Sequence, residues 1–349
     1  MIHAHLLAIA EAASIWSERT AERKESMNLS TFMNITIPML IAFAVAAVSG
    51  KFLIPELIKL KAQQTERDDG PKSHLTKTGT PNMGGLMILA GLTVSCLIFA
   101  GKDPEVLPVL FLTLGFGLVG FIDDFLKVKK RSSDGLSVKQ KMALQIVISI
   151  VFGLILVFFN EIELSMKVPF AEGMVLNLGI LSFPALVFIA IATVNGTNFT
   201  DGVDGLSTCV TIAVALFFTI AAACAGSGVS AAGGAMIGAL LGFLLYNAHP
   251  AKVFMGDTGS LALGGFVVGI SYTLQLPLFI PIVGFIYLLE VVSVILQVAY
   301  FKKTHGKRLF RMAPIHHHFE LGGYSEVQVV ALFTIITVLL GAVALLGLW

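Results

Sequence analysis

Ten apolar stretches alternate with short polar segments along the chain, and this alternation is its main structural signal. A transmembrane helix needs about 20 consecutive apolar residues, and most of the stretches approach that length. Only two charged residues, Lys51 and Glu290, fall inside them. The pattern predicts an all-α, polytopic membrane protein of about ten transmembrane helices. The stretches are 34–54, 82–100, 106–122, 142–159, 178–194, 206–225, 229–246, 258–276, 278–301 and 327–349.

The composition favours the same class of protein. Of the 349 residues, 56% are hydrophobic and 13% are charged, which is too apolar for one soluble core. A membrane β-barrel would instead show segments of about ten residues with alternating polarity. The three cysteines lie in apolar stretches without CxxC spacing, so we interpret them as small apolar residues. We expect residues 31–349 to form one transmembrane domain and residues 1–30 to be a poorly ordered N-terminal extension.

Lysine and arginine residues gather in alternate polar segments. Segments 55–81, 127–141, 247–257 and 302–326 hold 17 of the 23. Loops rich in these residues stay in the cytoplasm, so the pattern predicts cytoplasmic loops at these four places and extracytoplasmic termini. The net charge of +1 carries no information about a partner, and we expect no nucleic acid to bind.

Acidic residues stand at the ends of apolar stretches, beside the predicted cytoplasmic segments. A carboxylate at the membrane centre costs about 2.5–3.5 kcal/mol, so acids are kept where they meet a cation, water or a polar substrate. Asp123 and Asp124 close the third stretch, where the helix dipole disfavours acids. One reading is an interfacial helix end neutralised by Lys127 and its basic neighbours. We favour a site in which one carboxylate faces a metal or acceptor.

Two further polar segments carry similar chemistry. In segment 195–206, Asn198, Asp201 and Asp204 are spaced by three residues, which on a helical turn would place them on one face. Segment 247–260 ends in Gly-Asp-Thr-Gly-Ser, where Asp257 offers a hard oxygen ligand for Mg²⁺ and a helix start offers N–H groups to a phosphate. A tight turn or an aspartate N-cap is the simpler alternative for both segments. We expect these acids to converge with Asp123 at one site.

The remaining candidates lie in the basic segments. His316, His317 and His318 are consecutive and cannot all bind one ion, so we expect contacts with phosphate or substrate rather than a zinc site. Lys77 either holds an anion or is an ordinary cytoplasmic lysine. Glu290, inside an apolar stretch, is either functional or a buried acid with a hydrogen-bond partner.

Four motifs in order resemble the polyprenyl-phosphate N-acetylhexosamine-1-phosphate transferases. They are the Asp-Asp pair, Asn-Phe-Thr-Asp-Gly-Val-Asp-Gly-Leu, Phe-Met-Gly-Asp-Thr-Gly-Ser and Ala-Pro-Ile-His-His-His-Phe-Glu. The resemblance runs from about residue 33 to the end, and the triple histidine followed by Phe-Glu-Leu favours the branch that uses UDP-MurNAc-pentapeptide. Asn82 stands where the family usually has Thr, and Tyr324 where it has Trp, which leaves fine substrate contacts open.

The resemblance implies a multi-pass enzyme of the bacterial inner membrane with its site facing the cytoplasm. It would use Mg²⁺ to transfer phospho-MurNAc-pentapeptide from UDP to undecaprenyl phosphate, giving lipid I and UMP for peptidoglycan synthesis, and it would commonly form a homodimer. The implied catalytic residues are Asp123, Asp124, Asp257, Asn198, Asp201, His316, His317 and His318; the implied substrate-binding residues are Lys77, Lys127, Lys139, Asp204, Asn247 and Phe254; the implied metal ligands are Asp257 and Asp124.

For the reaction we expect direct attack of the lipid phosphate on the diphosphate, with Asp123 orienting the acceptor. A covalent phospho-aspartyl intermediate is the competing mechanism. Transfer from UDP-N-acetylglucosamine is the alternative within the family. An ion-coupled transporter is the alternative class, but transporters place acids near the bilayer midplane in repeated, broken helices.

Overall fold

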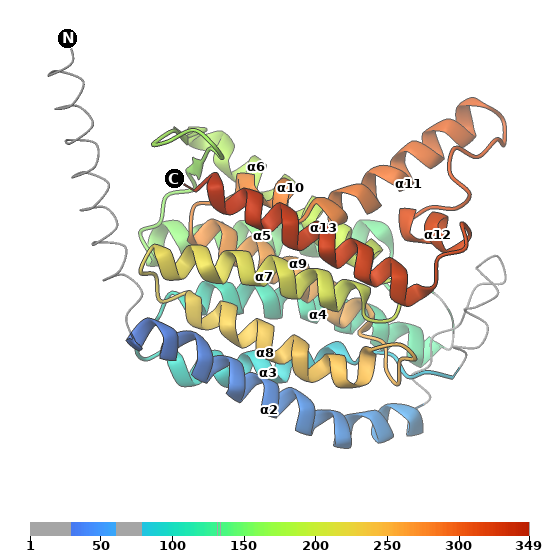
Figure 1. Cartoon of the computed structure of the whole chain (residues 1–349), viewed down its shortest axis with the longest axis horizontal. Helices are drawn as coiled ribbons and strands as arrows, with labels where there is room; N and C mark the ends of the chain where they lie inside the picture. The colour runs from blue at the N-terminus through green and yellow to red at the C-terminus, as the bar shows by residue number, and fades with distance from the viewer. Residues whose placement is uncertain (1–28, 61–78, 131, 133, 349) are drawn as a thin grey trace, which may run out of the picture.

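The computed structural model of the chain describes residues 29–60, 79–130, 132 and 134–348. These residues are almost wholly helical (Figure 1). The α-helices are α2 (Leu29–Lys59), α3 (Gly85–Phe99), α4 (Val106–Lys130), α5 (Val138–Phe159), α6 (Ser182–Thr200), α7 (Leu206–Cys224), α8 (Ser230–Asn247), α9 (Gly256–Thr273), α10 (Ile280–Val283), α11 (Phe285–Lys303), α12 (Ile315–Glu320) and α13 (Glu326–Leu346). Two 3₁₀ turns, η2 (Gly179–Leu181) and η3 (Pro277–Phe279), precede α6 and α10.

Each predicted apolar stretch corresponds to a helix, and the ninth is divided by Gly284 into α10 and α11. Within the described residues, eight helices are long and apolar enough to cross a membrane, and α3 is a shorter apolar helix of 15 residues. The 18-residue helix α9 is less apolar because it carries Asp257 and four further small or polar residues in its first turns. The prediction of an all-α, polytopic membrane protein is confirmed.

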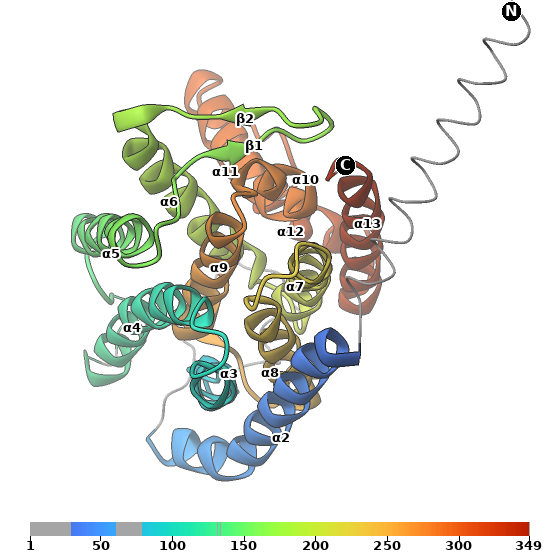
Figure 2. The same ribbon diagram turned by 90° about the vertical axis from the view of Figure 1, so that its left-hand side faces the viewer.

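Helix α9 forms the centre of the bundle. Every residue from Thr258 to Thr273 is buried, and the view along the helices shows α4, α6, α7 and α8 around α9 (Figure 2). Glycines permit this close packing: a Cβ on Gly120 of α4 would lie 2.0 Å from the carbonyl oxygen of Asp257. The two backbones therefore touch near the N-terminus of α9, which fixes Asp257 beside the end of α4.

The two ends of the bundle differ in chemistry. At one end, Lys102 donates to Asn34 near the start of α2, and the amide of Phe170 donates to the carbonyl of Gly347 after α13. The short hairpin of β1 (Met166–Lys167) and β2 (Val175–Leu176) lies at this end. The opposite end holds α12 and the loops before α5, α7 and α9 (Figure 1). The described site residues that the sequence predicts lie in these loops or in the helix ends beside them.

Candidate active site

Three aspartates predicted from the sequence lie together at this end of the bundle. Oxygen atoms of Asp123, Asp124 and Asp257 are all within 4.8 Å of one another. Asp123 and Asp124 are 3% and 1% exposed, so both carboxylates depend on protein partners rather than bulk water. The expected meeting of the third and eighth apolar stretches at one acidic site is therefore present in the structure.

Backbone and hydroxyl donors hold two of these carboxylates. The amide and the hydroxyl of Thr258 donate to Asp124 Oδ2 at 2.8 and 2.7 Å. The amide of Leu136 donates to Asp123 Oδ1 at 2.8 Å. Thr258 belongs to the first turn of α9, so Asp124 uses an N–H group that a helix start leaves free. The two neighbouring acids thus point to different partners, as their 100° separation on α4 requires.

Two lysines neutralise part of the acidic charge. Lys127 Nζ lies 2.6 Å from Asp123 Oδ2 and 3.4 Å from Asp257 Oδ2. Lys141 Nζ lies 2.7 Å from the same Asp257 oxygen. Three carboxylates and two ammonium groups leave one negative charge uncompensated, which favours a further cation.

The second lysine differs from the one named in the sequence analysis. Lys139 is exposed, whereas Lys141 is the α5 residue that reaches Asp257. Side chains two residues apart on a helix point about 200° away from each other, so only one of these two lysines can face the aspartates. From the sequence, Lys141 is one of several basic residues in the segment 127–141. Nothing in the sequence shows which side of α5 packs on α4.

Asn198 connects the end of α6 to the same site. Its Nδ2 donates to Asp257 Oδ1 at 2.9 Å and to Ser260 Oγ at 2.8 Å. Asp201 follows one turn later as the C-cap residue of α6 and is partly buried. Asn198 therefore fixes the orientation of Asp257, while Asp201 begins the turn that leads to Asp204.

Asp204 lies in a second group, apart from the three aspartates. Its Oδ2 is 3.0 Å from His249 Nδ1 and accepts the amide of Ala251 at 3.0 Å. Glu326, at the start of α13, lies 3.7 Å from His249 Nδ1. Ligand atoms of Asp204, His249 and Glu326 are within 4.8 Å of one another. Asp204 is therefore not grouped within 4.8 Å of Asp123, Asp124 and Asp257; it connects the α6–α7 loop, the α8–α9 loop and α13. Its predicted contact with the substrate stays a prediction.

Asn247 and Phe254 shape the loop between α8 and α9. Asn247 is 2% exposed; its Oδ1 accepts from Thr208 at 2.8 Å and its Nδ2 donates to the carbonyl of Val253 at 3.1 Å. The amide of Phe254 donates to the carbonyl of Pro81 at 2.9 Å. Asn247 therefore holds the loop from inside, and Phe254 joins it to the segment before α3.

That segment places Asn82 beside the aspartates. Asn82 Nδ2 lies 3.4 Å from Asp124 Oδ1, and Asn82 Oδ1 is buried with no partner among the described residues. Asn82 is one of the two positions that differ from the family pattern, so the difference lies at the acidic site itself. Lys77, predicted to bind substrate, lies outside the described residues.

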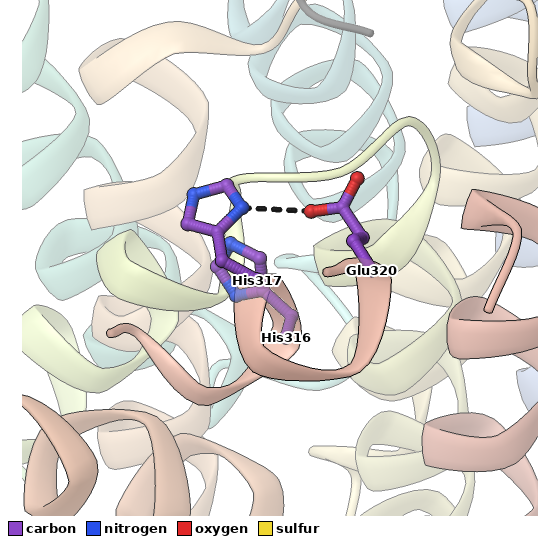
Figure 3. Close-up of side chains that lie close together, drawn as sticks. All are labelled: His316, His317 and Glu320. Atoms are coloured by element: carbon purple, nitrogen blue, oxygen red, sulfur yellow. Dashed lines mark hydrogen bonds and ion pairs between the residues drawn. The ribbon is translucent and has the colours of Figure 1, made fainter. Parts of the chain in front are cut away.

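The three histidines have three different partners. His316 Nδ1 lies 3.0 Å from Glu290 Oε1. His317 Nδ1 lies 2.7 Å from Glu320 Oε2, as Figure 3 shows. His318 Nδ1 accepts the backbone amide of Arg311 at 3.1 Å. Ligand atoms of His316, His317 and Glu320 nevertheless lie within 4.8 Å of one another. The prediction that the histidines contact phosphate or substrate rather than a metal ion stays a prediction.

The donor set at the aspartates suits Mg²⁺. Carboxylate oxygens are the ligands that this ion prefers, and Asn82 Oδ1 adds an unused hard oxygen nearby. Asp124 Oδ1 is the carboxylate oxygen with the longest contacts, 3.4 Å to Asn82 and 4.0 Å to Lys127. The local charge, the oxygen donors and the close spacing all fit a divalent cation.

Comparisons with known proteins assign the chain to a family. The profile of the family described as "Glycosyl transferase family 4" matches residues 106–275. A phospho-N-acetylmuramoyl-pentapeptide-transferase of Acetivibrio thermocellus is 48% identical over 305 residues, covering 86% of this chain and 91% of that protein. The chain belongs to the phospho-N-acetylmuramoyl-pentapeptide-transferase family. Proteins of this name from Clostridium botulinum and Clostridioides difficile are 48% and 44% identical, covering 89% and 90% of this chain and 95% and 98% of their own lengths.

Membership agrees with the resemblance drawn from the motifs, and this member of the transferase family is a bacterial membrane protein. The structure adds site residues that the sequence analysis did not single out. Lys141 and Thr258 contact the aspartates, His249 contacts the Asp204 carboxylate, and Glu326 accepts the Asp204 backbone amide. Thr258 belongs to the Gly-Asp-Thr-Gly-Ser motif, so the sequence pointed to its neighbourhood. Glu326 follows the N-cap Ser325 of α13, and in the sequence it looks like an ordinary acid in the first turn of a helix.

Proposed function

We propose that this protein transfers phospho-MurNAc-pentapeptide from UDP-MurNAc-pentapeptide to undecaprenyl phosphate, forming lipid I and UMP. The single observation that carries the proposal is the group of Asp123, Asp124 and Asp257 with two lysines, in a chain 48% identical to a transferase of that name. A diphosphate donor and a phosphate acceptor both bring negative charge. A site that combines carboxylates for a cation with ammonium groups for phosphate oxygens suits that pair of substrates.

We propose that Asp257, aided by Asp124, holds Mg²⁺, which when bound would neutralise charge on the phosphate oxygens. Asn198 and Lys141 orient Asp257 for this role, and Thr258 orients Asp124. Lys127 lies between the acids and is placed to meet a phosphate oxygen.

Asp123 is proposed to orient the acceptor. Its carboxylate is held by the Leu136 amide and by Lys127, so its orientation is fixed. A phosphate monoester has a second pKa of about 6, so the lipid phosphate is largely dianionic at neutral pH and needs little help from a base. Positioning and charge neutralisation then dominate catalysis, as in other phosphoryl transfers. Labelled phosphoprotein trapped with the UDP substrate alone would contradict direct attack and favour the covalent route.

The donor is tested with purified protein in detergent. UDP-MurNAc-pentapeptide and UDP-N-acetylglucosamine are each supplied as sole donor with undecaprenyl phosphate and Mg²⁺, and butanol-extractable labelled lipid and released UMP are measured. We expect product from the first donor only. Product from the second donor alone would assign the chain to the alternative reaction. Substrate movement that needs a sealed vesicle, without product in detergent, would instead indicate transport.

We also propose that the site faces the cytoplasm and that the protein is a homodimer. Lys129 in the last turn of α4, and Lys252 and Arg311 in loops, lie at the same end of the helices as the aspartates, which supports the first proposal. Alkaline phosphatase fused to the C-terminus should be active, because this end is proposed to lie outside the cytoplasm. An inactive fusion would indicate the opposite orientation. The dimer rests on family resemblance, and the mass of the detergent-solubilised protein by light scattering tests it.

A further inference from the structure

Glu290 is an acid buried inside a membrane-spanning helix. It lies in α11 and is 0% exposed, so its carboxyl group needs a protein partner. Oε1 lies 3.0 Å from His316 Nδ1, and Oε2 has no partner among the described residues. The proposed chemistry at the three aspartates does not use this acid.

His316 carries the contact onward to the loop between α6 and α7. The histidine is 1% exposed, and its Nε2 has no hydrogen-bond partner among the described residues. A Cβ built on Gly202 would lie 2.2 Å from Nε2 and 2.6 Å from Cε1. The ring edge therefore packs directly on the Gly202 backbone, between Asp201 and Asp204 in the chain.

The two contacts select one tautomer of the ring. If Nδ1 carries the proton, it donates to Glu290 and leaves a lone pair on Nε2 against the Gly202 methylene, which needs no donor there. If Nε2 carries the proton, a buried N–H points at carbon, and an unsatisfied buried donor costs about 1–3 kcal/mol. The partner at one ring nitrogen determines the state of the other.

We propose that Glu290 is a positioning residue that fixes His316 as the Nδ1–H tautomer. Through its packing on Gly202, the His316 ring then holds in place the turn that carries Asp201 and Asp204. Glycine is required at position 202 because the ring occupies the space a side chain would need. The pair thus connects α11 and α12 to a loop whose acids are expected to bind the substrate. The activity arm of the test rests on the proposed transferase reaction; the spectroscopic arm does not.

The first experiment reads the tautomer directly. Wild-type protein, Glu290→Met and His316→Gln are labelled with ¹⁵N at histidine, and the imidazole ¹⁵N shifts are recorded in detergent. We expect a signal, absent from His316→Gln, with the proton on Nδ1 in the wild type. In Glu290→Met no acceptor faces Nδ1, so the preference for Nδ1–H should be lost and an Nε2–H signal should appear. An Nε2–H ring in the wild type, or an unchanged ring in Glu290→Met, would overturn the proposal.

The second experiment separates positioning from folding. Glu290→Met removes the acceptor and keeps an unbranched side chain of similar length, so we expect a melting temperature close to wild type but a KM for the UDP substrate raised about tenfold, the effect of one lost hydrogen bond, with a smaller change in kcat. Glu290→Gln, whose amide oxygen can still accept from Nδ1–H, should keep a KM near wild type. Gly202→Ala should raise KM about as much as Glu290→Met, and the double variant of these two should be no worse than the poorer single variant, because both act through His316. Additive losses would contradict the coupling.

Glu105→Met is the matched control. Glu105 contacts Ser227 at the opposite end of the bundle, so its substitution should change neither KM nor the histidine spectrum. Equal KM increases in Glu105→Met and Glu290→Met would show a general effect of removing an acid and overturn the proposal. If wild-type protein made no lipid product at all, the proposed function would fail, while the tautomer in the wild type and its change in Glu290→Met would still decide this inference.

Discussion

Replacing Lys141 by methionine tests the acidic site most directly, because the chain supplies its own control two residues away. Lys141 Nζ lies 2.7 Å from Asp257 Oδ2, whereas Lys139 is exposed on the same helix. Methionine keeps the length and apolar stem of lysine and removes the charge. Lys141→Met and Lys139→Met therefore differ in the charge lost from the site and in little else.

The magnitude follows from the geometry. Opposite unit charges 2.7 Å apart attract by about 6 kcal/mol at an effective dielectric constant of about 20. The Lys141 and Asp257 side chains are 21% and 17% exposed, so water screens the pair, and Lys127 and Asn198 remain as partners of Asp257. We therefore expect a net loss of about 2–3 kcal/mol, which lowers kcat/KM about 30- to 150-fold.

The assay is release of UMP in detergent, measured across a Mg²⁺ titration. Lys141→Met should lower kcat/KM as stated, while half-maximal activity should need less Mg²⁺, because the site gains one uncompensated negative charge. Lys139→Met should stay within about threefold of wild type, as expected for exposed charges. Equal losses in the two variants, or a higher Mg²⁺ requirement in Lys141→Met, would refute the reasoning.

Three further substitutions test the structure. Asp257→Asn should abolish most turnover and raise the Mg²⁺ requirement; near-full turnover at limiting Mg²⁺ would remove the ligand assignment. Gly120→Ala should lower the melting temperature by several degrees, since its Cβ would lie 2.0 Å from the Asp257 carbonyl, whereas Gly101→Ala, with open space around it, should not. Thr208→Val should destabilise the fold by about 1–3 kcal/mol in denaturant unfolding because Asn247 Oδ1 loses its donor; unchanged stability would exclude that role.

Hydropathy alone was enough to predict the long apolar helices, but not the short helix α12 in a basic segment. Each apolar stretch became a helix because a chain in lipid must satisfy its own backbone hydrogen bonds, and this constraint is local in sequence. The division at Gly284 was missed, since the stretch 278–301 is apolar throughout. The position of α9 at the centre of the bundle was also not predictable, because its small residues allow close packing only once neighbouring helices are in place.

The acidic motifs, and the residue types able to hold a cation, were likewise readable from the sequence. Asp123, Asp124 and Asp257 can be recognised as site candidates from the sequence, because charges are rare in so apolar a chain, and the structure brings them together. Tertiary packing decided the rest. In the folded protein Lys141 rather than Lys139 contacts Asp257, Asp204 contacts His249, and Glu290 contacts His316. Those outcomes depend on the rotation of each helix about its axis and on backbone contacts at glycines, which are set by neighbours far away in the chain.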